Sequence, residues 1–319
     1  MPTPPDAVTA WGPATLSNLG PGFDALGLCV TGRGDRVTAW RTDAPGVTVE
    51  AAPPADGPPL PTDSGRNTAG RAAAWVLRAS GAGGGVALRV EKGVPLGSGV
   101  GGSAASAVAG AWAANEALGR PFGRADLVEA VLDGEAASGG RHGDNVLPAL
   151  LGGLVLVSPA DPAEHRRLAL PAPPPLPVLL PRVRVLTREA RAALPETVPH
   201  ADATAQAAEL ALLLDALAAG DWDRAGRHLV RDRLAEPYRA PLVPVYDAVR
   251  RAAREAGAAG CALSGSGPAL FALPGEGADP RVILDAMRAA SAAGGVPADG
   301  WLAGVDTEGV RTVAAPPDA

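Results

Sequence analysis

Alternating apolar and polar positions dominate the first third of the chain. Val86, Leu88 and Val90 alternate with other residues, and in an extended segment such residues share one face. This pattern predicts strands at residues 7–11, 27–31, 36–41, 47–51 and 86–90. A Pro/Gly-rich stretch at residues 52–61 predicts a surface loop.

Helical patterns become frequent after this loop. Helices are predicted at residues 68–79, 103–118, 127–137, 187–194, 202–219, 241–256 and 280–292. Short apolar strands are predicted at residues 153–158, 260–263, 269–273 and 301–305. Helices mixed with strands indicate α+β packing, and the Pro-rich stretch between residues 158 and 180 predicts a domain boundary.

Composition narrows the class of protein. The 319 residues are 47% hydrophobic and 19% charged, which predicts one large or two ordinary globular domains. A net charge of -6 argues against nucleic acid as a partner. Only Cys29 and Cys261 are present, which excludes structural zinc and fits a reducing compartment. No signal peptide or membrane span is visible, so we expect a cytoplasmic protein without membrane contact.

A Gly-rich segment, PLGSGVGGSAAS at residues 95–106, lies between a predicted strand and an Ala-rich helix. Backbone amides of such a loop, with the positive end of the helix, can bind an anion. The alternative is a flexible loop before an ordinary N-capped helix. Lys92 is the only lysine and precedes the loop, which excludes a Walker A motif. Any phosphate would therefore be bound mostly by backbone amides and arginine.

Three further segments concentrate polar side chains. The first, PATLSNLGPGFDALG at residues 13–27, places Asn18 and Asp24 on a turn, where an Asx-turn is the structural alternative. GEAASGGRHGDN at residues 134–145 places Glu, His, Asp and Asn at one helix end and the following loop. GCALSGSGP at residues 260–268 is a strand running into a second Gly/Ser turn.

In this order, the segments resemble the motifs of the GHMP kinases, and within them of the homoserine kinases. RHGDNV at residues 141–146, TREAR at 187–191 and EPYR at 236–239 strengthen the resemblance, which extends from Val8 to about Val305. It implies an α+β, two-domain GHMP kinase fold. Residues 1–160 would form an ATP-binding domain like ribosomal protein S5 domain 2, and residues 161–319 a ferredoxin-like domain completing the substrate site.

The same resemblance implies an activity. The enzyme would use ATP and Mg²⁺ to phosphorylate the side-chain hydroxyl of L-homoserine, giving O-phospho-L-homoserine, a step of threonine biosynthesis. The expected partner is this small molecule, without nucleic acid or membrane; a homodimer is an open alternative for the assembly. Whether a general base is used also stays open, because a loose phosphoryl-transfer transition state does not require one.

Site residues follow from the matching motif positions. By resemblance, Asn145 lies near the attacking hydroxyl, and Ser103 and Glu135 hold Mg²⁺. The residues implied to bind the substrate are Asn18, Asp24, His142, Asp144, Thr187, Arg191 and Arg239. Asn67 is implied to contact adenine. The remaining nucleotide-binding positions are Pro95, Leu96, Gly97, Ser98, Gly99, Val100, Gly101, Gly102, Ser103, Ala104 and Ala105.

One spacing departs from the family pattern. Glu135 precedes His142 with one residue fewer than is usual, so either the loop through Gly139 is shorter or the Glu is displaced. Three other functions are alternatives. The first is a GHMP kinase for another small alcohol, such as a mevalonate-type or sugar substrate; Arg191 and Arg239 suit an amino-acid carboxylate and have no obvious use on a neutral sugar. A non-catalytic relative is expected to lack Ser103, His142 or Asp144, and a Rossmann domain needs an acidic residue that is not found at its place.

Overall fold

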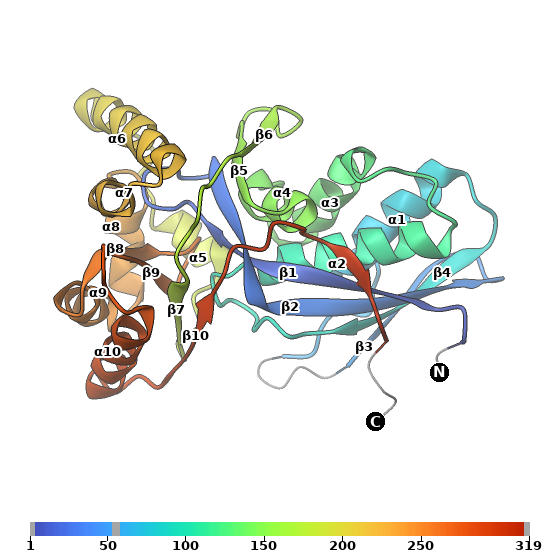
Figure 1. The fold of residues 1–319 in the computed structure, drawn as a ribbon. Helices are drawn as coiled ribbons and strands as arrows, with labels where there is room; N and C mark the ends of the chain where they lie inside the picture. The colour runs from blue at the N-terminus through green and yellow to red at the C-terminus, as the bar shows by residue number, and fades with distance from the viewer. Residues whose placement is uncertain (1–3, 53–57, 316–319) are drawn as a thin grey trace.

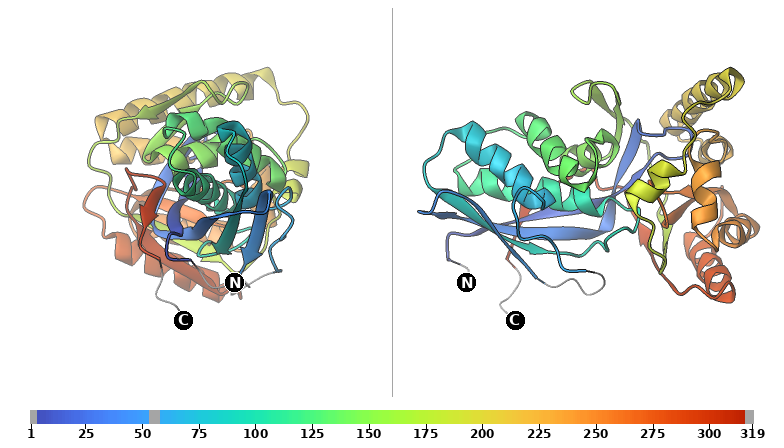
Figure 2. Two further views of the ribbon diagram at one scale, coloured as in Figure 1. Left: turned by 90° about the vertical axis from the view of Figure 1, so that its right-hand side faces the viewer. Right: turned by 180° about the vertical axis from the view of Figure 1, so that it is seen from behind.

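The structure is a computed structural model that describes residues 4–52 and 58–315. It contains two β-sheets placed end to end, each covered by helices (Figures 1 and 2). The α+β prediction is confirmed. The predicted loop at residues 52–61 lies partly outside the described residues.

The first sheet has seven strands and belongs mainly to the N-terminal half. Its strands are β1 (Val8–Ser17), β2 (Leu26–Thr42), β3 (Gly46–Ala51), β4 (Gly85–Glu91), β5 (Leu154–Val157), β6 (His165–Leu168) and β11 (Arg311–Val313). The helices α1 (Thr68–Ser80), α2 (Gly102–Ala117), α3 (Val128–Glu135) and α4 (Gly143–Leu151) lie together on one face (Figure 1). A bulge between Pro13 and Ala14 shifts the antiparallel register of β1 and β2.

The second sheet is antiparallel, with the strand order β10–β7–β9–β8. These strands are β7 (Leu176–Pro181), β8 (Ala258–Leu263), β9 (Leu270–Pro274) and β10 (Ala298–Ala303). The helices of this half are α5 (Thr187–Ala192), α6 (His200–Ala219), α7 (Trp222–Leu229), α8 (Glu236–Arg239), α9 (Tyr246–Glu255) and α10 (Pro280–Ala293). One buried cluster contains Leu16 and Leu28 of the first sheet together with Phe271 and Leu213, so a shared core joins the halves.

Several elements differ from their sequence predictions. The two predicted strands at residues 27–31 and 36–41 are parts of the single long strand β2. Helix α4 was missed because Pro148 lies inside it and its first residue, Gly143, follows a Gly-rich stretch. The short strands β6, β7 and β11 and helix α7 were also missed. The domain division at residue 160 stays a prediction; β6 and β11, from beyond it, pair within the first sheet.

Across the described residues, no helix is both long enough and apolar enough to cross a bilayer.

Candidate active site

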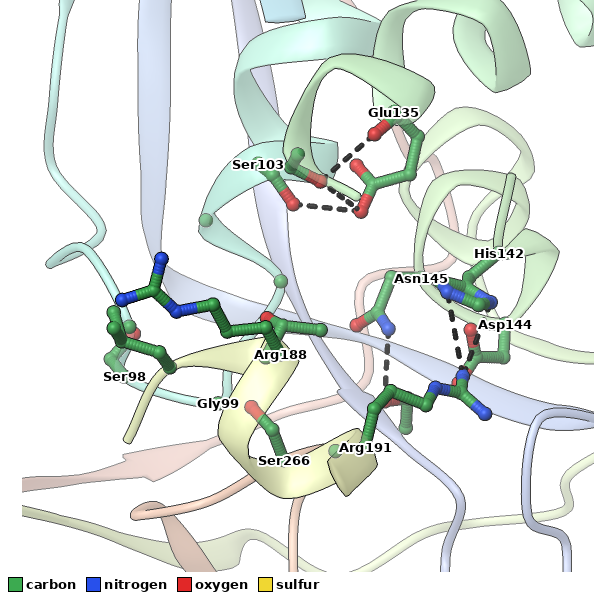
Figure 3. Close-up of a pocket in the computed structure, with 18 of the residues that line it drawn as sticks. Ser98, Gly99, Ser103, Glu135, His142, Asp144, Asn145, Arg188, Arg191 and Ser266 are labelled. Carbon is green, nitrogen blue, oxygen red and sulfur yellow. Dashed lines mark hydrogen bonds between the residues drawn. The ribbon is translucent and has the colours of Figure 1, made fainter. Parts of the chain in front are cut away.

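A cavity of about 360 Å³ brings the sequence motifs together. The glycine loop, the β1–β2 turn and the start of α4 line it from the first half, and α5, Arg239 and the turn after β8 from the second (Figure 3). The predicted site residues that line it are Asn18, Asp24, Leu96, Gly97, Ser98, Gly99, Gly101, Gly102, Ser103, Glu135, His142, Asp144, Asn145, Thr187, Arg191 and Arg239. Asn18 and Gly265, 247 residues apart in sequence, therefore meet in one site.

The glycine loop leads directly into α2, whose N-terminal end faces the cavity. Gly101 is the N-cap residue, with a φ of 68° that disfavours residues with a side chain. A Cβ there would lie 2.0 Å from Thr15 Oγ1, so the loop can approach β1 only with glycine at this position. The unpaired amides and the positive end of α2 make this end of the cavity suited to phosphate.

Lys92 lies beneath the glycine loop and not in the cavity. Its side chain is 3% exposed and forms an ion pair with the fully buried Asp35. The same ammonium donates to Gly102 O at 2.6 Å and to Ser106 Oγ at 3.1 Å. Lys92 therefore anchors the start of α2, and its charge is neutralised by Asp35.

Ser103 and Glu135 meet at the first turn of α2. The Ser103 hydroxyl donates to Glu135 Oε1 at 2.9 Å, and Ser138 Oγ donates to the same oxygen at 3.0 Å. Glu135 Oε2 is buried and has no hydrogen-bond partner in the described structure. Burial raises the pKa of Glu135 to about 7 despite both hydrogen bonds. The carboxylate thus lies beside the first turn of α2, in contact with Ser103.

These oxygens fit a Mg²⁺ ion. A hydroxyl and a carboxylate with an unpartnered, buried oxygen are ligands that this hard cation prefers. No group of three or more His, Cys, Asp or Glu side chains that could hold a metal occurs among the described residues. Nucleotide phosphates and water would have to complete the coordination, as is usual for Mg²⁺ in phosphoryl-transfer sites.

Asn145 projects from the first turn of α4 toward β1. Its Oδ1 accepts from Thr15 Oγ1 at 2.7 Å, and its Nδ2 donates to Ser17 Oγ at 2.9 Å. Two hydrogen bonds from one strand fix the orientation of the amide at the middle of the cavity.

A bidentate ion pair spans the two halves at the other end. Arg191 Nη1 and Nη2 donate to the two carboxylate oxygens of Asp24 at 2.7 and 2.8 Å. The same guanidinium approaches the His142 ring, with Nη2 at 3.3 Å from Nδ1. Burial and then the charge of Arg191 lower the pKa of His142, so its ring is neutral at pH 7.

Next to this pair lie a buried cation without a carboxylate partner and a buried acid with one unpartnered oxygen. The Arg239 residue is 4% exposed, and its guanidinium donates to Gly265 O at 2.9 Å and lies 5.0 Å from the centre of the Phe23 ring. No carboxylate of the described residues forms an ion pair with it. Asp144 is 3% exposed, and its Oδ1 lacks a hydrogen-bond partner there. Burial, reinforced by the charge of Asp24, raises the pKa of Asp144 to about 7.

Comparison with known proteins places this site in a family. Residues 67–153 match the model of the GHMP kinases N terminal domain, and residues 213–293 that of the GHMP kinases C terminal. Homoserine kinase of Pyrococcus abyssi is 40% identical over 293 residues, which are 92% of this chain and 95% of that protein. A crystal structure of homoserine kinase from Cytophaga hutchinsonii superposes with a TM-score of 0.91 at 36% identity, covering 98% of this chain and 99% of that one. The chain belongs to the homoserine kinase family of GHMP kinases.

Membership in the homoserine kinase family makes the chain a kinase that uses ATP with Mg²⁺. L. major mevalonate kinase, at 19% identity and a TM-score of 0.70, shares the fold. The two-domain GHMP kinase fold implied by the sequence resemblance is thereby confirmed.

Some predicted nucleotide-site residues do not line the cavity. Asn67 is the N-cap of α1: its Oδ1 accepts from Gly70 N at 3.1 Å, and its Nδ2 donates to Pro61 O at 2.8 Å. The others outside the lining are Pro95, Val100, Ala104 and Ala105. Their roles toward the nucleotide stay predictions.

Sequence reasoning also missed lining residues. Ser17, Arg184 and Arg188 line the cavity although no role was assigned to them. Arg188 lies inside the TREAR segment, and its place in that motif was a usable signal. Arg184 precedes the motif, and nothing in the local pattern distinguishes it from a solvated surface arginine.

Proposed function

We propose that the protein transfers the γ-phosphoryl group of ATP to the side-chain hydroxyl of L-homoserine, forming O-phospho-L-homoserine on the route to threonine. The observation that carries this proposal is the buried Arg239 guanidinium, which has no carboxylate partner in the described structure, beside the buried Asp144. Removing a charge from water without a partner is unfavourable, so such groups commonly mark a site for a charged ligand.

A zwitterionic amino acid supplies what these groups lack. Its carboxylate would accept from Arg239 and from Arg191, whose planar guanidinium can hold a carboxylate with two parallel hydrogen bonds. Its ammonium would donate to Asp144 and Asp24. Arg191 is paired with Asp24 in this structure, so a substrate carboxylate that binds Arg191 would weaken that ion pair. The substrate ammonium would then form a new ion pair with Asp24.

The phosphoryl donor would bind at the opposite end of the cavity, beside the glycine loop. The amides of the glycine loop would hold the nucleotide phosphates, and Ser103 and Glu135 would hold Mg²⁺, which neutralises charge on the phosphate oxygens. Asn145, fixed by Thr15 and Ser17, would orient the substrate hydroxyl between the two ends. A loose transition state keeps the hydroxyl proton until late, so positioning supplies most of the catalysis.

Three broader proposals accompany this function. The enzyme would act in the cytoplasm, where its buried free thiols, Cys29 and Cys261, stay reduced. Residues 1–160 would bind ATP, with residues 161–319 completing the substrate site. A homodimer is the assembly to test by sedimentation.

A coupled assay of ADP release tests the proposed substrate. We expect Mg²⁺-dependent phosphorylation of L-homoserine, with D-homoserine, butanol, L-threonine, mevalonate and galactose much poorer. A substrate without a carboxylate would leave the buried guanidinium unpaired, at a cost of about 2–5 kcal/mol. Equal turnover of an uncharged alcohol would contradict the proposal.

A further inference from the structure

Two arginines from the second half of the chain line the cavity. Arg184 lies between β7 and α5, and Arg188 lies in the first turn of α5. Both residues are exposed, and neither forms a hydrogen bond or an ion pair within the described residues. A cation that lines a cavity without a counter-ion is free to bind an anionic ligand.

Both side chains lie close to the glycine loop. A Cβ built on Gly97 would lie 3.3 Å from Arg184 Cγ and 3.8 Å from its Nε, so the Arg184 side chain packs against the loop. Figure 3 shows the Arg188 side chain extending from α5 toward Ser98. The amides of the first half and these guanidinium groups of the second half therefore face the same space.

The other cations near this space are already engaged. Lys92 is buried in its ion pair with Asp35 beneath the loop. Arg191 is held by Asp24, and Arg239 is buried at the other end of the cavity. The triphosphate of ATP keeps a net negative charge with one Mg²⁺ bound, and the two exposed arginines are the remaining local source of positive charge among the lining residues.

We propose that Arg184 and Arg188, from the second half, bind the β- and γ-phosphates of the nucleotide next to the glycine loop. The planar guanidinium fork matches phosphate oxygens. The nucleotide phosphates are then held by amides of the first half together with guanidinium groups of the second half. This proposal rests on the use of ATP by the proposed function and is independent of which alcohol is phosphorylated.

Isothermal titration without any alcohol substrate tests it, with the Mg²⁺ complexes of AMP-PNP and ADP and with AMP as probes. Arg184→Ala and Arg188→Ala are each expected to weaken AMP-PNP binding about three- to tenfold, the range for a partly solvated charge-assisted contact. ADP binding is expected to weaken less and AMP binding to stay unchanged. Arg182→Ala is the matched control, because Arg182 is an exposed arginine of the same segment that pairs with Asp299 at 3.5 Å and does not line the cavity.

Unchanged AMP-PNP affinity in both variants would overturn the proposal. So would an equal loss for AMP, or a loss in Arg182→Ala as large as in the other two, because either would indicate a general effect of charge. A wild-type enzyme that binds AMP-PNP as expected but does not phosphorylate L-homoserine would refute the proposed substrate and leave the phosphate contacts standing.

Discussion

The Ser103 hydroxyl donates a 2.9 Å hydrogen bond to one oxygen of Glu135, while the other oxygen of this carboxylate is buried without a hydrogen-bond partner in the described structure. Helix α2 begins at Gly102 with Gly101 as its N-cap, and no side chain caps it. Ser103 is therefore not the N-cap of this helix. Its hydroxyl points to the carboxylate and the cavity, where a metal bound to ATP would lie.

We therefore expect Ser103→Ala to lower kcat about ten- to a hundredfold, in the range seen when a metal site loses a supporting contact. Nucleotide affinity should change little, because it depends on many backbone amides. The free energy of unfolding should fall by only about 0.5–1.5 kcal/mol, the value of one hydrogen bond. Steady-state kinetics and thermal melting of the same preparation check both expectations. A lower melting temperature with unchanged kcat would mean that the contact is structural.

Lys92→Met is expected to destabilise the protein by about 3–5 kcal/mol, because it leaves the buried charge of Asp35 without its cation. Chemical denaturation measures this loss. Replacing the partner as well, in Lys92→Met with Asp35→Asn, should recover part of it, since an uncharged amide is easier to bury. A loss below about 1 kcal/mol in the single variant would contradict a buried ion pair beneath the glycine loop.

Glu236, which does not line the cavity, offers a pH test of a buried acid. Its carboxylate is buried against Tyr246, whose hydroxyl donates to it, and burial raises its pKa to about 7 from an ordinary value of 4.5. The folded state therefore binds this proton more tightly than the unfolded chain. Its contribution to stability is complete below about pH 4.5 and is lost as the pH rises through about 7.

Glu236→Gln removes this titration. The melting temperature of the variant relative to wild type should therefore rise between pH 5 and pH 8, when both are measured without ligand. A difference that stays constant across this range would show that Glu236 is not a buried acid with a raised pKa.

The motif register was enough to predict most of the cavity lining. Ser103 and Glu135 are 32 residues apart, and their motif positions indicated one shared site; in the structure the two side chains are in contact and line the cavity. Local sequence patterns could not predict which side chains of the two halves form ion pairs with each other. Asp24 and Arg191, separated by 167 residues, were assigned to opposite ends of a zwitterion, and the structure joins them in one ion pair. Such a pair depends on how two domains meet, which no local spacing encodes.

The missed elements have physical reasons as well. Pro148 and Gly143 weaken the helical pattern of α4, yet tertiary packing keeps it helical because Val146, Leu147 and Leu150 are buried in the core. Strand β7 contains Pro177 and Pro181 and follows three consecutive prolines, a pattern that suggested a linker. The ion pair of Lys92 could not be predicted from local patterns either, because its partner Asp35 lies 57 residues earlier, on strand β2.

The proposed carboxylate contacts are tested by comparing KM for L-homoserine in three arginine variants. Arg191→Ala and Arg239→Ala should each raise KM for L-homoserine about ten- to a hundredfold, since a charge-assisted hydrogen bond to a carboxylate contributes about 1.5–3 kcal/mol. KM for ATP should stay nearly unchanged, because the glycine loop lies at the other end of the cavity. Arg233 is the control: it is 54% exposed, pairs with Asp202 at 2.9 Å and does not line the cavity. If Arg233→Ala raised KM for L-homoserine as much as the other two, general electrostatic attraction would explain the loss, and the specific carboxylate contacts would be wrong.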